Sequence, residues 1–171
     1  MDINYDQNKA HYVVATCIIV RKQGDNFKFL IAKRADWEKN SPGKWTVPGG
    51  KLETSDYTKR EHDTKEGKQW YNVIEDLIRR EVREEVGLEI KEIGYVCSLA
   101  YIRHDNIPCL VISLYASPAY EEIKLCSALS EYAWVSLDEA KNYDLIDGIY
   151  EELEILETHL KSGESMCWKK Q

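Results

Sequence analysis

The chain has 171 residues, 43% of them hydrophobic and 31% charged, a balance typical of one globular domain with a buried core and not of a disordered chain. Its formal net charge of −7 argues against a nucleic-acid polymer as partner, because phosphate backbones are bound by clustered lysine and arginine. Five cysteines without a C-x-x-C pair argue against a disulfide framework and against a structural zinc site.

The N-terminal part of the chain predicts a β-hairpin followed by loops. The first twelve residues lack the basic and apolar layout of a secretory signal, and no apolar run approaches the roughly 18 residues that span a bilayer, so we expect a cytoplasmic protein without a membrane partner. His11–Val20 and Phe27–Ala32 are rich in β-branched and apolar residues and flank a Gly-Asp-Asn turn, which predicts two paired strands. Arg34–Lys44 is predicted to be a polar loop, and Trp45–Gly50 a short strand that ends in a Pro-Gly-Gly turn.

The next segment combines a polar stretch with an amphipathic helix. Thr54–Tyr71 is very polar and is predicted to be an exposed loop. A helix is expected from Asn72, which suits an N-cap, with Glu75 three residues later as in a capping box. Gly87 is a natural C-terminal stop. Apolar residues recur at helical spacing and predict one buried stripe: Val73, Ile74, Leu77, Ile78 and Val82.

The second half of the chain predicts three more strands and a terminal helix. Glu89–Ala100, Cys109–Ala116 and Glu131–Val135 have the composition of strands. Ser136 is expected to cap a final helix, with apolar residues at helical intervals from Leu145 to Leu160. Because a helix lies between strand-rich segments, we expect an α/β sandwich around a mixed β-sheet.

The most informative segment is the acidic helix that contains Arg-Glu-Val-Arg-Glu-Glu-Val-Gly-Leu from Arg80 to Leu88. At about 100° per residue, Glu81, Glu84 and Glu85 fall within one arc of roughly 100°. Three carboxylates grouped in this way repel one another unless a cation lies among them, and hard oxygen ligands suit Mg²⁺ or Mn²⁺. The alternative is a solvated helix whose glutamates pair with Arg80 and neighbouring basic residues.

The sequence before the helix favours the metal site. A Trp-x-x-Pro-Gly-Gly turn ends in Gly50, and Arg-Glu-apolar-x-Glu-Glu-x-Gly-apolar follows from Arg80. Together they resemble the box of the Nudix hydrolase family, and the likeness of the flanking strands extends from about Val13 to Leu160. The resemblance implies one Nudix domain over residues 1–171, with an α/β/α sandwich around a mixed β-sheet.

The chain departs from the family in the spacing of this box. Arg80 follows Gly50 by 30 positions, which is 16 more than in the family. We place the extra residues in the polar segment 54–72 and predict that this insertion gates the substrate. In the family a glutamate after the glycine orients the arginine; Asp56 stands at that position here, Glu61 and Glu66 are rivals, and an absent partner is the remaining alternative.

The resemblance also implies the chemistry of the site. Glu81, Glu84 and Glu85, together with the Gly50 carbonyl, would bind Mg²⁺ or Mn²⁺, with Arg80 as a further catalytic residue. Water would attack a phosphorus of a pyrophosphate link, and a glutamate would accept its proton.

Candidates for contacts with the substrate lie outside the box. Arg34, at the end of a predicted strand, is a candidate for phosphate binding, and Trp37 and Tyr101, in or near polar loops, are candidates for stacking on a base. Glu131, with Glu121 and Glu122, stands where some family members place an extra metal ligand, base or substrate-reading acid. For each residue the alternative is an ordinary surface position.

We expect a small-molecule nucleotide as the substrate, in the first place an ordinary or modified nucleoside triphosphate, with nucleotide sugars, ADP-ribose and dinucleoside polyphosphates as alternatives. Two other functions on the same fold are alternatives for this chain: a non-catalytic nucleotide-binding regulator and an isoprenyl-diphosphate isomerase. The three box carboxylates argue against the regulator. The intact box helix and the lack of an evident Cys/Glu pair placed for proton shuttling argue against the isomerase, although Cys97 and Cys109 keep it open. A homodimer is left open.

Overall fold

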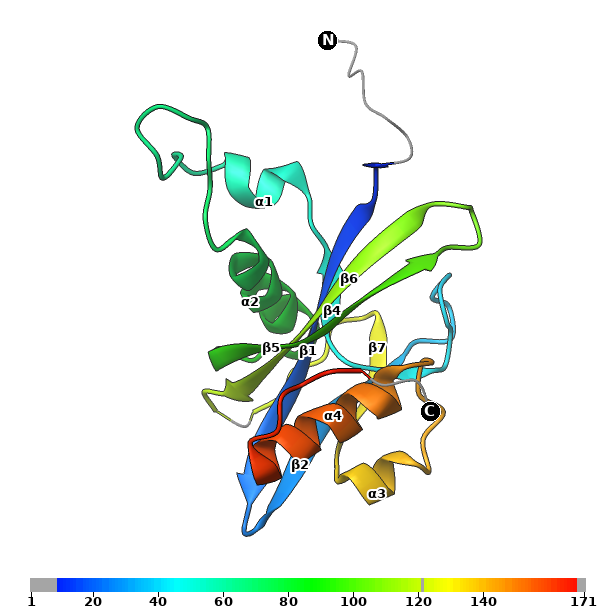
Figure 1. The fold of residues 1–171 in the computed structure, drawn as a ribbon. Helices are drawn as coiled ribbons and strands as arrows, with labels where there is room; N and C mark the ends of the chain where they lie inside the picture. Colours follow the sequence, from blue (N-terminus) through cyan, green and yellow to red (C-terminus); the bar gives the residue numbers. More distant parts are fainter. Residues whose placement is uncertain (1–8, 121, 169–171) are drawn as a thin grey trace.

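The computed structural model describes residues 9–120 and 122–168, which form a twisted sheet with helices on both sides (Figure 1). Within these residues the strands are β1 (Tyr12–Gln23), β2 (Asn26–Arg34), β3 (Trp45–Thr46), β4 (Gly49–Lys51), β5 (Ile90–Ile102), β6 (Pro108–Pro118) and β7 (Leu129–Val135). The helices are α1 (Thr54–Thr58), α2 (Val73–Val86), α3 (Leu137–Ala140) and α4 (Ile149–Ser162).

Strand β1 organises the sheet. It pairs antiparallel with β2 and β4 along one edge and parallel with β6 along the other, while β5 extends the sheet beyond β6. β7 pairs with β2, and β3 also lies against β2. The predicted mixed sheet and the α/β class are therefore confirmed.

Two hydrophobic cores lie on the two faces of this sheet, because successive residues of a strand point to opposite sides. Ala15, Cys17 and Ile19 of β1 pack in the core under α2, whereas Ile18 and Val20 pack in the core under α4. The predicted buried stripe of α2 is found, with Leu77, Ile78, Val82 and Val86 buried. Each fully buried side chain of this size stabilises the fold by about 1.5–3 kcal/mol.

The ends of two helices differ from the prediction. Asn72 precedes α2 in a left-handed conformation with φ of 56° and makes no side-chain cap hydrogen bond, so the predicted capping box is wrong. A side chain caps the first turn from the extended region, which Asn72 does not occupy. Ser136 does form a capping box with Glu139, but it starts the four-residue α3, and the terminal helix α4 begins later, after Gly148.

The polar segment 54–71 is more ordered than the predicted loop. Its first residues form α1, where the backbone N–H of Glu53 donates to Asp56 Oδ2 at 2.8 Å. Further along, the rings of Tyr57 and Trp70 pack 5.3 Å apart, and Trp70 donates its indole N–H to the carbonyl of Arg60. The sequence analysis did not predict α1. This short helix has no apolar residues at helical spacing, and the hydrogen bond that caps it joins polar residues only.

The helices and the cysteines bear on the expectations about membranes and disulfides. None of the helices in the described part of the chain is both long and apolar enough to cross a membrane. All five cysteines are free; three are buried among apolar residues, whereas Cys126 is half-buried and Cys167 is exposed.

Candidate active site

A large open cleft runs from the acidic face of α2 across one face of the sheet to the start of α4. Its volume is about 1230 Å³. The Gly49-Gly50 strand, α1 and α2 form one end; β1, β5 and β6 form the floor; and residues 146–149 with Glu152 form the other end. Glu81, Glu84 and Glu85 all line this cleft, so the predicted common face is observed.

The Pro-Gly-Gly turn brings backbone directly against the carboxylates of α2. The N–H of Gly49 donates to Glu85 Oε2 at 2.9 Å. At Gly50 an added Cβ would lie 2.0 Å from Glu81 Oε1, so only glycine leaves room for that carboxylate. The two glycines therefore position two of the three box glutamates, which the sequence motif alone does not reveal.

Arg80 lies at the centre of the acidic cluster. Its guanidinium donates from Nε to Asp56 Oδ1 at 3.0 Å and from Nη1 to Glu84 Oε2 at 2.9 Å, and it contacts Glu81 Oε1 at 2.9 Å. Asp56 is thus the observed partner of Arg80, as the spacing suggested, ahead of Glu61 and Glu66. One guanidinium faces three carboxylates, so this part of the site keeps an excess of negative charge.

Burial raises the pKa of two of the three box glutamates. It raises the pKa of Glu85 from 4.5 to about 7, against the lowering effect of the Gly49 hydrogen bond and of nearby Arg34. Burial also raises the pKa of Glu81, with Arg80 opposing it and Glu84 reinforcing it. The side chain of Glu84 is 59% exposed and forms an ion pair with Arg80. A cation placed here would relieve a real electrostatic cost.

The donor set fits Mg²⁺ or Mn²⁺ in chemistry, because it consists of carboxylate oxygens around a glycine backbone that one of them touches. In residues 9–120 and 122–168, however, no three carboxylate, imidazole or thiol groups converge on one point as the ligands of a single ion would. Glu84 is turned towards Arg80, so it would have to leave that ion pair to join Glu81 and Glu85.

Two of the predicted substrate contacts line the cleft. Arg34 lies at its edge but donates to Glu38 Oε2 at 2.8 Å and to the carbonyl of Asn40 at 2.6 Å. Its guanidinium therefore braces the loop after β2 as well as facing the cleft. Tyr101 lines the cleft from β5 with 47% of its surface exposed, which leaves its ring accessible.

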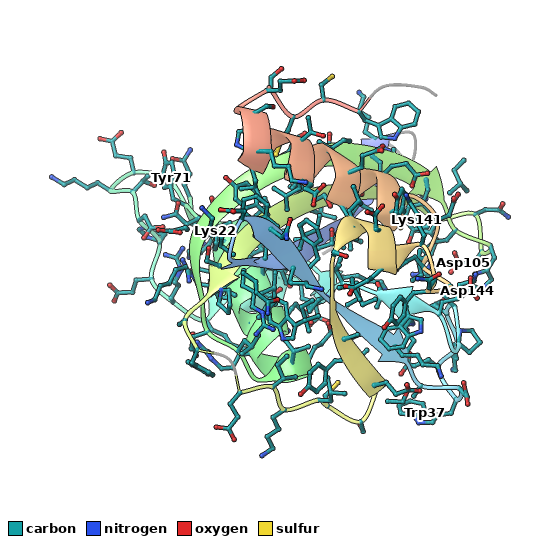
Figure 2. All side chains as sticks on the ribbon, turned by 90° about the horizontal axis from the view of Figure 1, so that it is seen from below. Lys22, Trp37, Tyr71, Asp105, Lys141 and Asp144 are labelled. Carbon is teal, nitrogen blue, oxygen red and sulfur yellow. The ribbon has the colours of Figure 1, made fainter. Side chains whose placement is uncertain are left out.

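The other two predicted contacts lie elsewhere. Trp37 is 66% exposed and points away from the molecule at its edge, as Figure 2 shows, and it is not among the residues that line the cleft. Glu131 lies on β7 opposite Lys33 of β2, and the two side chains form an ion pair of 2.8 Å outside the cleft. Of the related candidates, Glu122 is exposed and Glu121 lies outside the described residues.

Several cleft residues were not singled out from the sequence. Lys59 lines the cleft from the segment after α1, and Trp168 lines it from the tail after α4. A buried polar group also reaches the cleft, where Glu152 of α4 accepts a short hydrogen bond from Ser113 of β6. The helical spacing of α4 offered the only signal for this group, since it places Glu152 on the same side as the buried Leu153 and Leu156.

Glu152 also bears on the isomerase alternative, because its carboxyl lies near the Cys97 thiol. Burial raises the pKa of Cys97 to about 12, and burial likewise raises that of Glu152. Cys97 and Glu152 are neighbours in space, and of the two only Glu152 lines the cleft. An acid and a base that shuttle a proton across a substrate must lie on opposite sides of it. Cys97 and Glu152 lie next to each other, so the substrate cannot lie between them.

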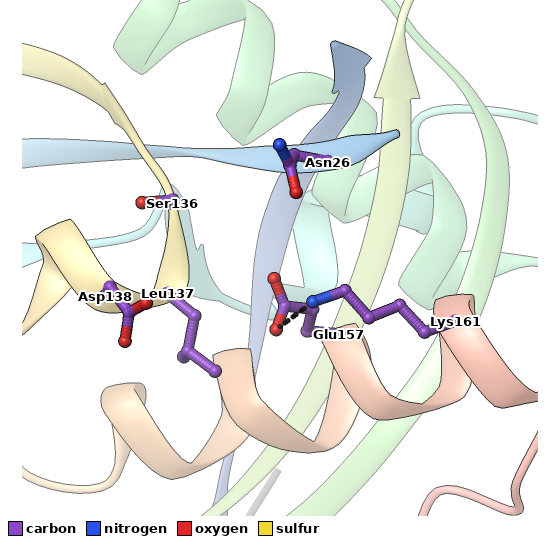
Figure 3. Close-up of a pocket in the computed structure, with 6 residues that line it drawn as sticks. All are labelled: Asn26, Ser136, Leu137, Asp138, Glu157 and Lys161. Atoms are coloured by element: carbon purple, nitrogen blue, oxygen red, sulfur yellow. Dashed lines mark ion pairs between the residues drawn. The ribbon is translucent and has the colours of Figure 1, made fainter. Parts of the chain in front are cut away.

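A second hollow of about 260 Å³ lies between the start of β2, α3 and α4 (Figure 3). Its wall includes the ion pair between Lys161 and Glu157, whose atoms are 2.9 Å apart. The lining consists of Asn26, Ser136, Leu137, Asp138, Glu157 and Lys161, and it contains none of the predicted site residues. The chemistry of the molecule therefore concentrates in the larger cleft.

The sequence of the chain matches a known domain family and a known bacterial enzyme. A profile of the NUDIX domain matches residues 10–154. The nucleoside triphosphatase NudI of Escherichia coli O17:K52:H18 (strain UMN026 / ExPEC) is 27% identical over 139 residues, which cover 75% of this chain and 85% of that protein.

Solved structures share the fold at lower identity. The NUDIX domain of Shewanella oneidensis NrtR complexed with ADP ribose superposes with a TM-score of 0.65 at 17% identity, and the match covers 94% of this chain and 95% of that one. A C. elegans Ap4A hydrolase in a binary complex superposes with a TM-score of 0.63 at 18% identity and covers 87% and 97%.

Proposed function

Because this chain belongs to the Nudix family and is a pyrophosphohydrolase of that family, we propose that it hydrolyses a nucleoside triphosphate, ordinary or modified, with Mg²⁺ or Mn²⁺. The products would be the nucleoside monophosphate and pyrophosphate. The observation that carries this proposal is the acidic cluster of α2, in which Glu81 and Glu85 are fixed against a Gly-Gly backbone and Arg80 is the one guanidinium shared by three carboxylates.

Each residue of the cluster has a proposed task. Glu81 and Glu85 are held in place, by Gly50 and by the Gly49 N–H respectively, and are suited to act as fixed ligands. Glu84 is exposed and completes the set when it turns from Arg80. Arg80, anchored by Asp56, acts as a positioning residue that keeps the carboxylates from repelling one another.

The reaction needs charge neutralisation more than covalent chemistry from the protein. When bound, the divalent ions supply Lewis acidity towards the non-bridging phosphate oxygens. A water oxygen attacks one phosphorus, the bond from that phosphorus to the bridging oxygen breaks, and the proton of the water passes to one of the box glutamates. Lys59 and Arg34 face the same cleft and can pair with phosphate oxygens of the substrate.

The choice of a nucleoside triphosphate is supported by the NudI relative, which is named a nucleoside triphosphatase and matches three quarters of this chain. The neighbours in complex with ADP ribose or described as an Ap4A hydrolase share the fold, so their ligands belong in the test as competitors. The open cleft of about 1230 Å³ is large enough for any of these compounds.

The test is a panel of (d)NTPs, ADP-ribose, nucleotide sugars and dinucleoside polyphosphates, incubated with and without Mg²⁺ and resolved by chromatography. Glu84→Gln should abolish cleavage. Glu89→Gln is the matched control, because Glu89 lies just beyond α2 and pairs with Arg83 outside the cleft. Metal-dependent release of pyrophosphate from a triphosphate supports the proposal. Binding of nucleotides without any cleavage would favour the regulator instead.

A further inference from the structure

Glu152 is a buried acid at the inner wall of the cleft, far from the metal-binding face. Its surface is 6% exposed, and with Ser113 it makes up the set of buried polar or charged residues in the described part of the chain. It lies in the first turn of α4, and it lines the cleft together with Thr16 and Val111 of the sheet. A carboxyl group at such a position costs stability unless hydrogen-bond donors satisfy it.

The donors supplied by the protein itself are few. Ser113 donates its hydroxyl proton to Glu152 Oε2, and the Cys97 thiol lies nearby. Among the described residues, no lysine, arginine or histidine forms an ion pair with Glu152. Its neighbour in sequence, Glu151, adds a second negative charge instead. A leucine would join α4 to the sheet without the cost of burying an acid. The carboxyl therefore has unused capacity to accept hydrogen bonds.

The hydroxyl chain behind Glu152 fixes what this wall offers to a ligand. Thr16 Oγ1 lies 3.0 Å from Ser113 Oγ. Because Ser113 has one proton and gives it to Glu152, Thr16 must be the donor in its contact with Ser113. Thr16 and Glu152 both line the cleft, and the side-chain oxygens of both are left as acceptors. The wall is therefore built to receive N–H or O–H donors.

The position of this wall relative to the glutamates matches the two ends of a nucleotide. Gly49, Thr16 and Ser113 stand in one row across β4, β1 and β6, since Thr16 is the register partner of both Gly49 and Ser113. Two strand spacings of about 4.8 Å separate the ends of this row, on the order of 10 Å. Gly49 holds Glu85 at the phosphate end, and a sugar can bridge this distance to a base near Glu152.

We propose that Glu152, oriented by Ser113 and Thr16, is a specificity-determining residue that accepts hydrogen bonds from the nucleobase, so that the protein favours bases with an exocyclic amino group. This inference rests on the proposed function, because it assumes that the phosphates occupy the end of the cleft near α2. A site built to accept an N–H discriminates against the analogue that lacks it, because the buried acceptor is then left unpaired.

The experiment uses triphosphates in pairs that differ at one amino group: CTP with UTP, GTP with ITP, and ATP with purine riboside triphosphate. For each pair kcat/KM and, from tryptophan fluorescence, Kd are measured with the full-length wild-type protein, Glu152→Gln and Glu151→Gln. Glu151 is the matched control, since it lies in the same helical turn and does not line the cleft. Ribose 5-triphosphate reports on the phosphate end alone.

In the wild type we expect a preference of about tenfold to a hundredfold for the amino member of at least one pair. Glu152→Gln should reduce this preference to about twofold or less, while ribose 5-triphosphate and the Glu151→Gln protein behave as the wild type. If Glu152→Gln fails to fold by circular dichroism, Ser113→Ala takes its place and should weaken the same preference.

Two results would overturn the inference: no amino preference in the wild type, or an equal loss on all substrates including the base-free one, which is what a purely structural role gives. Failure of the proposed function is a separate outcome, in which the wild type cleaves no triphosphate. The Kd values of the pairs then still decide whether Glu152 reads the base.

Discussion

A single methyl group added at Gly49 or at Gly50 should separate the structural role of the Pro-Gly-Gly turn from its chemical role. At Gly50 the new Cβ would lie 2.0 Å from Glu81 Oε1. At Gly49 it would lie 2.4 Å from the carbonyl oxygen of Ala15 and 2.8 Å from the Cα of Thr16. Neither glycine has a positive φ, so space rather than backbone strain decides the outcome.

The two clashes differ in what can move. The Glu81 carboxyl ends a flexible side chain and can retreat by roughly 1.4 Å to reach ordinary contact at 3.4 Å. A displacement of about 1 Å in a catalytic group costs on the order of a hundredfold in rate, so Gly50→Ala should lose that much kcat/KM with little change in stability. Gly49→Ala meets backbone that is held in the sheet, which should cost about 1–3 kcal/mol of folding free energy.

The assay measures kcat/KM for the best triphosphate over a range of Mg²⁺ concentrations, alongside Tm. Gly50→Ala should need more Mg²⁺ and keep its Tm, whereas Gly49→Ala should lower Tm by roughly 3–10 °C. The reasoning is refuted if Gly50→Ala hydrolyses substrate at the wild-type rate and Mg²⁺ dependence. It is equally refuted if the two variants lose stability to the same extent, because the clash with Glu81 would then be structural.

Three further predictions concern the surroundings of this turn. Asp56→Asn removes one of the three carboxylates on Arg80, so kcat should fall about tenfold while Tm changes by less than about 3 °C, since a partly exposed ion pair contributes little to stability; an unchanged kcat would show that Arg80 needs no anchor. Burial raises the pKa of Glu85 from 4.5 in the unfolded chain to about 7 in the folded protein, so the folded state holds this proton more tightly; the resulting stabilisation is complete below pH 4.5 and is lost as pH rises through 7. In the presence of EDTA, melting curves of the wild type should therefore fall in Tm from pH 4.5 to 8, and Glu85→Gln should have a flatter profile; identical profiles would contradict the assignment. Replacing residues 60–71 by a short Gly-Ser linker, which keeps Asp56 and Lys59, should change KM if the insertion gates the substrate, and an unchanged KM would rule gating out.

The sequence predicted those features that depend on local periodicity. The hairpin of β1 and β2, the buried stripe of α2 and the common face of Glu81, Glu84 and Glu85 all repeat within a few residues, so a single stretch of chain contains the signal. The partner of Arg80 was also within reach, because the spacing of the box glycine pointed to Asp56. Such features survive the insertion because each is set by residues on one side of it or, for Asp56, at its very start.

The substrate end of the cleft could not be predicted in this way. Thr16 and Ser113 are 97 residues apart in sequence, and they meet only because β1 and β6 pair in parallel. The helical spacing of α4 places Glu152 on the buried side of the helix, but it does not show that this glutamate meets Ser113 at the wall of a cleft. The position of Trp37 likewise depends on the path of its loop: an aromatic residue in a polar loop is a reasonable stacking candidate, but here it points outward and does not line the cleft.

One carboxylate of the insertion, that of Asp56, reaches the acidic cluster of α2. Asp56 Oδ2 accepts the N–H of Glu53 and starts α1, while Oδ1 accepts the Nε of Arg80. The folding of α1 therefore places the partner of Arg80 within a few residues of Gly50, before most of the extra chain has begun. The remaining residues of the insertion form a separate loop, and the packing of Trp70 on Tyr57 holds its two ends together. A lengthened box can keep its geometry because the residue that pairs with Arg80 lies at the start of the insertion, so the length of the chain after it does not change that contact.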